Sequence, residues 1–235
     1  MTTWIKVARY HLVDRLSYTA LPWGVLAFHF ALIVAIFKTA GPTMDAPGRV
    51  LYNQAFNLVV IYVVFMVLGL LAIVRSLPFV LAMDVNRRSY YAGTAALAAG
   101  LAAVYGLALA VLQAVERATG GWGMDLHFFR IPYILDGPWY LTWLTSFVGL
   151  SLMFIYGMWW GLVYRRWNLV GLLAFGAAQI IVVTGGVVIA SQVHAWPGIG
   201  RFLVTLSATG LTGSLAALVA VLLAGGLTTI RRITV

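Results

Sequence analysis

The stretch Arg75-Ser-Leu-Pro-Phe-Val-Leu-Ala-Met-Asp-Val-Asn-Arg-Arg-Ser-Tyr-Tyr-Ala-Gly93 lies between two long apolar runs. Pro78 suits the first turn of a new helix, and Ser89 can cap the next one. Three apolar residues then fall three and four positions apart on one helical face: Phe79, Val80 and Met83. Four polar or charged residues follow: Asp84, Asn86, Arg87 and Arg88. The pattern predicts a cytoplasmic docking element for another protein, while an ordinary charged loop at a membrane surface fits the spacing equally well.

The composition around this stretch excludes a soluble domain. Of the 235 residues, 63% are hydrophobic and only 9% are charged, and the mean hydropathy is +0.97. Ordinary globular domains have about 25% charged residues. Because the chain has no cysteine, it has no disulfide and no thiolate site. The net charge of +9 comes from residues at the ends of apolar runs, which indicates lipid contact and membrane orientation rather than nucleic acid.

Hydropathy and turn signals predict an all-α integral membrane protein that forms a single transmembrane domain. Residues 4–20 have an apolar residue at every fourth position and are expected to form an interfacial helix, with Trp4, Lys6, Arg9 and Arg15 among its side chains. Six spans are expected to follow: 21–37, 56–74, 92–115, 140–163, 169–190 and 202–228. Residues 191–201 contain glycine and proline and predict a break, and a short re-entrant helix is one interpretation of it. Gly157-x-x-x-Gly161 in the fourth span is a small-residue packing signature.

The positive charges give an orientation. With six spans, ten Lys and Arg residues fall on one side and five on the other. The richer side holds Lys6, Arg9, Arg15, Arg75, Arg87, Arg88, Arg165, Arg166, Arg231 and Arg232. Because positive residues favour the cytoplasm, we expect both termini and the 75–91 segment to be cytoplasmic.

The sequence offers little catalytic chemistry of its own. No Gly-x-x-x-x-Gly-Lys-Ser/Thr motif is present, so ATP would have to be bound by a partner. Four histidines, His11, His29, His127 and His194, fall at different predicted depths and do not pair as haem or metal ligands would. Carboxylates occur only in loops or at span ends, with Glu116 nearest to a buried position, and this argues against ion coupling.

Several side chains within the predicted spans could line a transport pathway. The candidates are Phe56, Asn57, Tyr62, Phe65, Met66, Gln179, Thr184 and Gln192. Polar residues at such positions also serve as hydrogen-bonding groups between helices, and this structural role is the favoured interpretation. The apolar candidates fit a helix core or a lipid-facing surface equally well.

The arrangement resembles the permease subunit of a type-two ATP-binding-cassette (ABC) transporter, in the exporter class. The resemblance rests on the N-terminal interfacial helix, on Leu77–Gly93 with its Asn-Arg-Arg-Ser-Tyr-Tyr string, on the Val163-Tyr-Arg-Arg-Trp167 turn and on the broken segment after the fifth span. It implies that the 77–91 loop is a coupling helix that inserts into an ATPase, and that residues 4–20 form a connecting helix. It also implies a location in the bacterial cytoplasmic membrane.

The same resemblance implies the partners. A second permease, identical or related, would pair with the chain through the first and fifth spans, and ABC ATPase subunits carrying ATP and Mg would dock beneath. The chain itself would hold no cofactor and catalyse no reaction, while an unidentified small or amphipathic substrate would cross. A secondary transporter is one alternative, although it would normally need an internal repeat or a buried ion site. A membrane anchor or redox subunit is the other.

Overall fold

The computed structural model describes residues 16–40, 57–81, 86–130, 135, 137–205 and 207–230. Every regular element in these ranges is helical. In chain order they are η1 (Leu16–Ala20), α2 (Leu21–Ala40), α4 (Val59–Leu71), η3 (Ala72–Ser76), α5 (Leu77–Leu81), α6 (Arg87–Ala118), η4 (Gly121–Asp125), α7 (Trp139–Gln192), α8 (Trp196–Thr205) and α9 (Ala208–Ile230). Five helices are long and apolar enough to cross a membrane: Tyr18–Thr39, Val59–Val80, Arg87–Ala118, Trp139–Gln192 and Ala208–Ile230. The expectation of a helical membrane protein is therefore confirmed.

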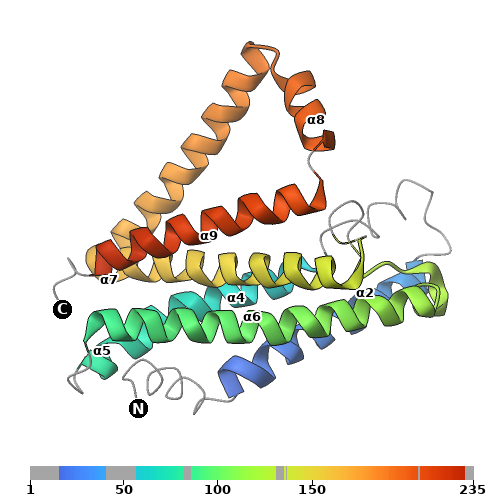
Figure 1. The fold of residues 1–235 in the computed structure, drawn as a ribbon, viewed down its shortest axis with the longest axis horizontal. Helices are drawn as coiled ribbons and strands as arrows, with labels where there is room; N and C mark the ends of the chain where they lie inside the picture. The colour runs from blue at the N-terminus through green and yellow to red at the C-terminus, as the bar shows by residue number, and fades with distance from the viewer. Residues whose placement is uncertain are drawn as a thin grey trace.

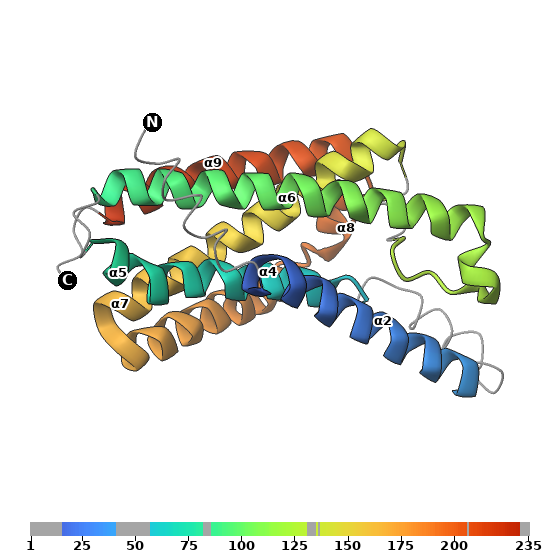
Figure 2. The ribbon, with the colours of Figure 1, turned by 90° about the horizontal axis from the view of Figure 1, so that it is seen from below.

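Helices α4, α6 and the first half of α7 lie side by side and form the centre of the molecule (Figures 1 and 2). Glycines make the contact between α4 and α7 close. A Cβ atom added to Gly157 would lie 1.8 Å from the carbonyl oxygen of Met66, and one on Gly69 would lie 1.9 Å from that of Phe154. Gly161 meets Ile73 in the same way, at 2.7 Å. The packing role predicted for Gly157-x-x-x-Gly161 is confirmed, and Gly69 supplies the complementary surface.

The fourth and fifth predicted spans both lie in α7, which bends at one residue. Asn168 has φ 53° and ψ −150°, whereas the residues on either side are helical. The turn expected at residues 164–168 is therefore reduced to a single residue with positive φ, of the kind found at the second position of a type II′ turn, where Gly, Asn and Asp dominate. Beyond it the second half of α7 leaves the bundle, and α8 and α9 bring the chain back to it (Figure 1). We call residues 169–205 the arm.

Two helix ends differ from the predicted span boundaries. The helix of the second span continues past Arg75, because η3 and α5 extend α4 to Leu81. Pro78 lacks the N–H that an α-helix needs at that position, and the π-helical η3 just before it accommodates the missing hydrogen bond. The sixth span does not begin at residue 202, since residues 202–205 belong to α8 and the Ser207 hydroxyl accepts a hydrogen bond from Gly210 N (3.1 Å) before α9 starts. The break expected at 191–201 is a tight turn around His194 followed by α8.

Candidate functional site

The predicted docking element lies where α5 ends and α6 begins. Phe79 is 54% exposed, whereas Val80 is only 3% exposed and belongs to the core. Val80 therefore packs inside the protein, and of the two described residues of the proposed apolar face Phe79 is the exposed one. Met83 and Asp84 lie outside the described residues. Within the described part of this segment, the surface that a partner could contact consists of Phe79 and the polar residues at the start of α6.

The start of α6 is set by Asn86. Its side-chain oxygen accepts a hydrogen bond from Arg88 N at 2.9 Å, and its φ and ψ of −61° and 134° are those of a helix N-cap. The predicted cap, Ser89, is instead inside the first turn, so this prediction was wrong by three positions. Because Asn86 holds the first turn, the exposed Arg88 and the half-buried Arg87 have a fixed backbone beneath them.

The helices on both sides of this connection are firmly packed. Tyr90, fully buried in α6, donates a hydrogen bond from its hydroxyl to the Ala72 carbonyl in η3. Leu77 and Val80 of α5 are also buried. A displacement applied at the α5–α6 connection would therefore be transmitted to both helices rather than absorbed locally.

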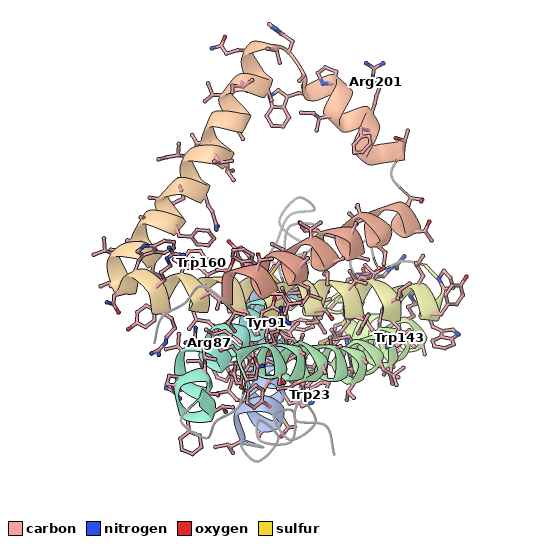
Figure 3. All side chains as sticks on the ribbon, turned by 60° about the vertical axis from the view of Figure 1, so that its left-hand side comes forward. Trp23, Arg87, Tyr91, Trp143, Trp160 and Arg201 are labelled. Atoms are coloured by element: carbon pink, nitrogen blue, oxygen red, sulfur yellow. The ribbon has the colours of Figure 1, made fainter. Side chains whose placement is uncertain are left out.

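Positive residues gather at this end of the bundle. The α5–α6 connection and the bend of α7 lie at the same end (Figure 1), so Arg75, Arg87 and Arg88 share it with Arg165 and Arg166. The Arg166 guanidinium lies 4.7 Å from the centre of the Trp167 ring. Figure 3 shows Arg87 at this end and Arg201 far from it on α8. Because α4, α6 and α7 run up and down the bundle in turn, these five arginines lie at one end, in agreement with the side assigned to them from the count of Lys and Arg residues.

The predicted pathway residues do not come together. Asn57 is buried and donates from Nδ2 to the His127 carbonyl (3.4 Å), and Phe65 is buried against the Tyr105 ring at 5.2 Å. Thr184 and Gln192 are exposed on the arm, where Gln179 accepts a hydrogen bond from the Tyr156 hydroxyl. Tyr62 and Met66 are half-buried on α4, and Phe56 lies outside the described residues. Within the described ranges, Asn57 and Gln179 make hydrogen bonds and Phe65 packs in the core, whereas Thr184 and Gln192 face outward, and a pathway role for any of them stays a prediction.

A buried carboxylate holds the segment after α6. Glu116 is 1% exposed and its Oε2 accepts hydrogen bonds from Phe128 N and Phe129 N (both 2.9 Å) and from Trp122 Nε1 (3.0 Å). Its Oε1 accepts from Arg130 N at 3.2 Å. All four groups are N–H donors, and a hydrogen bond from such a donor contributes about 1 kcal/mol or more. Glu116 therefore acts as a structural anchor, and its oxygens are already committed.

This role of Glu116 was missed at the sequence level. The available signal was a carboxylate at the end of an apolar span, followed by Gly120-Gly121, which is typical of a chain that turns back on itself. Gly121 has φ +70°, and a Cβ there would lie 2.7 Å from Leu126 N, so the reversal requires glycine. The chain after α6 is also held at the Leu135 carbonyl oxygen, which accepts hydrogen bonds from the side chains of Gln113 and Arg117 (3.3 Å).

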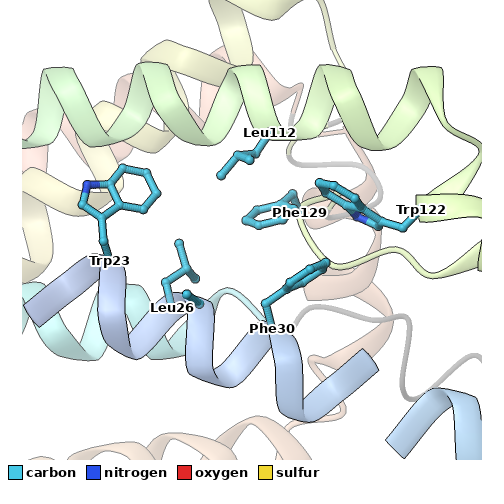
Figure 4. Close-up of a pocket in the computed structure, with 7 residues that line it drawn as sticks. Trp23, Leu26, Phe30, Leu112, Trp122 and Phe129 are labelled. Carbon is cyan, nitrogen blue, oxygen red and sulfur yellow. The ribbon is translucent and has the colours of Figure 1, made fainter. Parts of the chain in front are cut away.

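The anchored segment closes an apolar cavity of about 210 Å³ against α2 and α6 (Figure 4). The lining residues are Trp23, Leu26, Ala27, Phe30, Leu112, Trp122 and Phe129. Two of these side chains, Trp122 and Phe129, belong to residues that donate hydrogen bonds to Glu116. The rings of Phe30 and Trp122 meet edge to face at 5.0 Å. Among the described residues, the side chains in the wall of this cavity are all aliphatic or aromatic.

The remaining predicted site residues lie outside the described part of the chain: Trp4, Lys6, Arg9 and Arg15 of the expected connecting helix. Among the described residues, no group of three or more His, Asp or Glu side chains is arranged to hold a metal ion. No protein-family model, no curated protein and no solved structure matches this chain.

Proposed function

We propose that this chain is the permease subunit of an ATP-driven membrane exporter, moved by a separate ATPase that docks on the α5–α6 connection. The observation that carries the proposal is an exposed aromatic residue, Phe79, on α5, with Arg87 and Arg88 in the first turn of α6, where the buried Tyr90 bonds to the Ala72 carbonyl of η3. An aromatic anchor next to arginines is typical of a protein–protein hot spot. The chain has no nucleotide-binding motif, so the energy would come from the partner.

The clustering of positive residues supports a cytoplasmic location for this end. Arg75, Arg87, Arg88, Arg165 and Arg166 all lie there, and positive residues favour the cytoplasmic side. ATP is available on that side in the bacterial cytoplasmic membrane, where we place the protein. The substrate would be a small or amphipathic molecule that moves outward.

The exposed apolar surface of the arm favours pairing with a second permease subunit. No described residue between Leu169 and Thr205 is buried, although this region is strongly apolar. In an assembled transporter, the arm would pack against the second permease, identical or related to this chain, and lipid would cover the rest. Such pairing would leave the α5–α6 connections of both subunits facing the ATPases.

The test is co-purification in mild detergent from cells that produce this chain with a tagged ATPase from the same organism. We expect the ATPase to remain bound to the wild-type chain. The double variant Phe79→Ala/Arg87→Glu should lose it by tenfold or more, since truncating a hot-spot residue costs about 2 kcal/mol and 1.4 kcal/mol is a factor of ten.

A matched control is available on α8, where an arginine and an exposed phenylalanine are also adjacent. Phe202→Ala/Arg201→Glu changes the same residue types far from the α5–α6 connection. It should retain the ATPase at the wild-type level. If both double variants bind the ATPase equally well, or if no ATPase travels with the wild-type chain, the docking proposal is wrong.

A further inference from the structure

Three helices, α6, α7 and α9, surround a cavity of about 220 Å³ that is partly open. Small side chains create it, because Ala95 and Ala99 on α6 and Ala216 on α9 leave the helices in contact without filling the space between them. Ser151 on α7, which also lines the cavity, lies about midway between Trp139 and the bend at Asn168. The cavity is therefore near the middle of the fourth predicted span.

On either side of this cavity, α9 is closely packed against its neighbouring helices. At one end the hydroxyl groups of Thr145 and Thr212 are 2.7 Å apart, and Thr212 also bonds to the Ala208 carbonyl at 2.7 Å. At the other end the Tyr91 hydroxyl lies against Gly226, where an added Cβ would come within 2.1 Å of it. Because α9 fits tightly against α7 at one end and against α6 at the other, the hollow is a local feature rather than a general separation of α9.

The cavity wall contains one unsatisfied polar group. Ser151 is 5% exposed, and its hydroxyl has no hydrogen-bond partner. A buried hydroxyl without a partner costs about 1–3 kcal/mol. A water molecule would need two to four polar partners, and the other side chains around the cavity are apolar. The arrangement suits an occupant with an apolar body and a single hydrogen-bonding group.

Size and charge narrow the class of occupant. An apolar protein cavity of about 150 Å³ is large enough to bind benzene, so 220 Å³ accommodates a larger molecule. Among the described residues, the lining includes Val148, Ile155, Val219 and Leu223 but no charged side chain, so an ionised head group would remain uncompensated. The occupant is therefore neutral.

We propose that this cavity binds a neutral single-chain amphiphile, with its hydroxyl group on Ser151 and its hydrocarbon chain between α6 and α9. The occupant enters from the hydrocarbon of the membrane, where such molecules concentrate. The inference stands independently of the ATPase partner, because it depends only on the packing of three helices in this chain.

Photolabelling tests the proposal directly. The purified chain in detergent is irradiated with a diazirine derivative of octanol, and the labelled residues are located by mass spectrometry. We expect label on the cavity-lining positions of α6, α7 and α9, competed by excess octanol but not by octane. Ser151→Ala should reduce this labelling about five- to tenfold, because a hydrogen bond contributes about 1–1.5 kcal/mol.

Two filling variants and two matched controls complete the experiment. Ala95→Leu and Ala216→Leu add side-chain volume at lining positions on separate helices, the first half-buried and the second at the open side of the cavity, and each should abolish the labelling. Ala217→Leu and Ser214→Ala make the same kinds of change at positions of α9 that do not line the cavity and should leave it unchanged. Gel filtration and thermal unfolding identify any variant that fails to fold, and the other filling variant then decides. Equal labelling of the exposed arm, labelling that survives filling, or equal competition by octane would each overturn the proposal.

Discussion

The two halves of α7 are both apolar, yet they have opposite surroundings. All the buried residues of α7 lie between Thr142 and Val163, and none follows Asn168. The first half packs against α4, α6 and α9, whereas the second half extends away from the bundle (Figures 1 and 3). Hydropathy therefore places both halves in a membrane but does not say which one has a protein partner within the same chain.

Small residues distinguish the two halves better than hydrophobicity does. In the first half, Gly157 and Gly161 bring the backbone of α4 into contact. In the second half, Gly185 and Gly186 have nothing within 4 Å of an added Cβ, and β-branched residues dominate the exposed surface. Since dispersion and close packing drive helix association in lipid, glycine matters only where another backbone can meet it.

The largest expected effect tests this contrast between glycines. Gly157→Ala should lower the free energy of unfolding by about 3 kcal/mol or more, because the new methyl group would overlap the Met66 carbonyl. Gly185→Ala is the matched control on the arm and should be neutral or stabilising by up to about 1 kcal/mol. Thermal unfolding in the same detergent measures both. If both substitutions changed the free energy of unfolding equally, the distinction between a packed and an unpacked half of α7 would be wrong.

A smaller effect is expected at the anchor of the packed half. Glu116→Gln replaces one acceptor oxygen by an NH₂ group that faces N–H donors, and should destabilise the fold by about 2 kcal/mol. Hydrogen exchange of the amides of Phe128, Phe129 and Arg130 should accelerate with it. Lys38→Gln, which removes an exposed charge at the end of α2, should change neither measurement. Unchanged amide protection in Glu116→Gln would contradict the anchoring role.

The smallest expected effect concerns the base of the arm. The Tyr156 hydroxyl donates to Gln179, and the Trp160 and Phe175 rings meet edge to face at 5.1 Å. Tyr156→Phe should weaken this contact by about 1 kcal/mol and broaden the range of arm positions.

Pulsed electron paramagnetic resonance measures that range from spin labels on Val188→Cys and Leu218→Cys, since the chain has no cysteine of its own. The exposed Tyr140→Phe is the matched control and should leave the distance distribution unchanged. A distribution that does not respond to Tyr156→Phe would mean that other contacts hold the arm.

Much of the fold could be predicted from the sequence because span formation is local. A run of apolar residues forms a helix in a membrane whatever its neighbours are, so the helices and the grouping of arginines at one end followed from composition and order. The details of the candidate site were less predictable. Helix α5 continues α4 through Pro78 because η3 adjusts the hydrogen bonding, and Val80 turns inward because the core lies on that side.

The sequence alone determined that this is a helical membrane protein with most of its positive charges expected on one side and no nucleotide-binding motif. Only the tertiary structure decided that Glu116 anchors a segment up to fourteen residues away, that Asn168 divides α7 into a packed half and an arm, and that Ser151 lines a cavity. The physical reason is that hydropathy acts residue by residue along the chain. Hydrogen-bond partners and cavities depend instead on which helices meet, and at what distance.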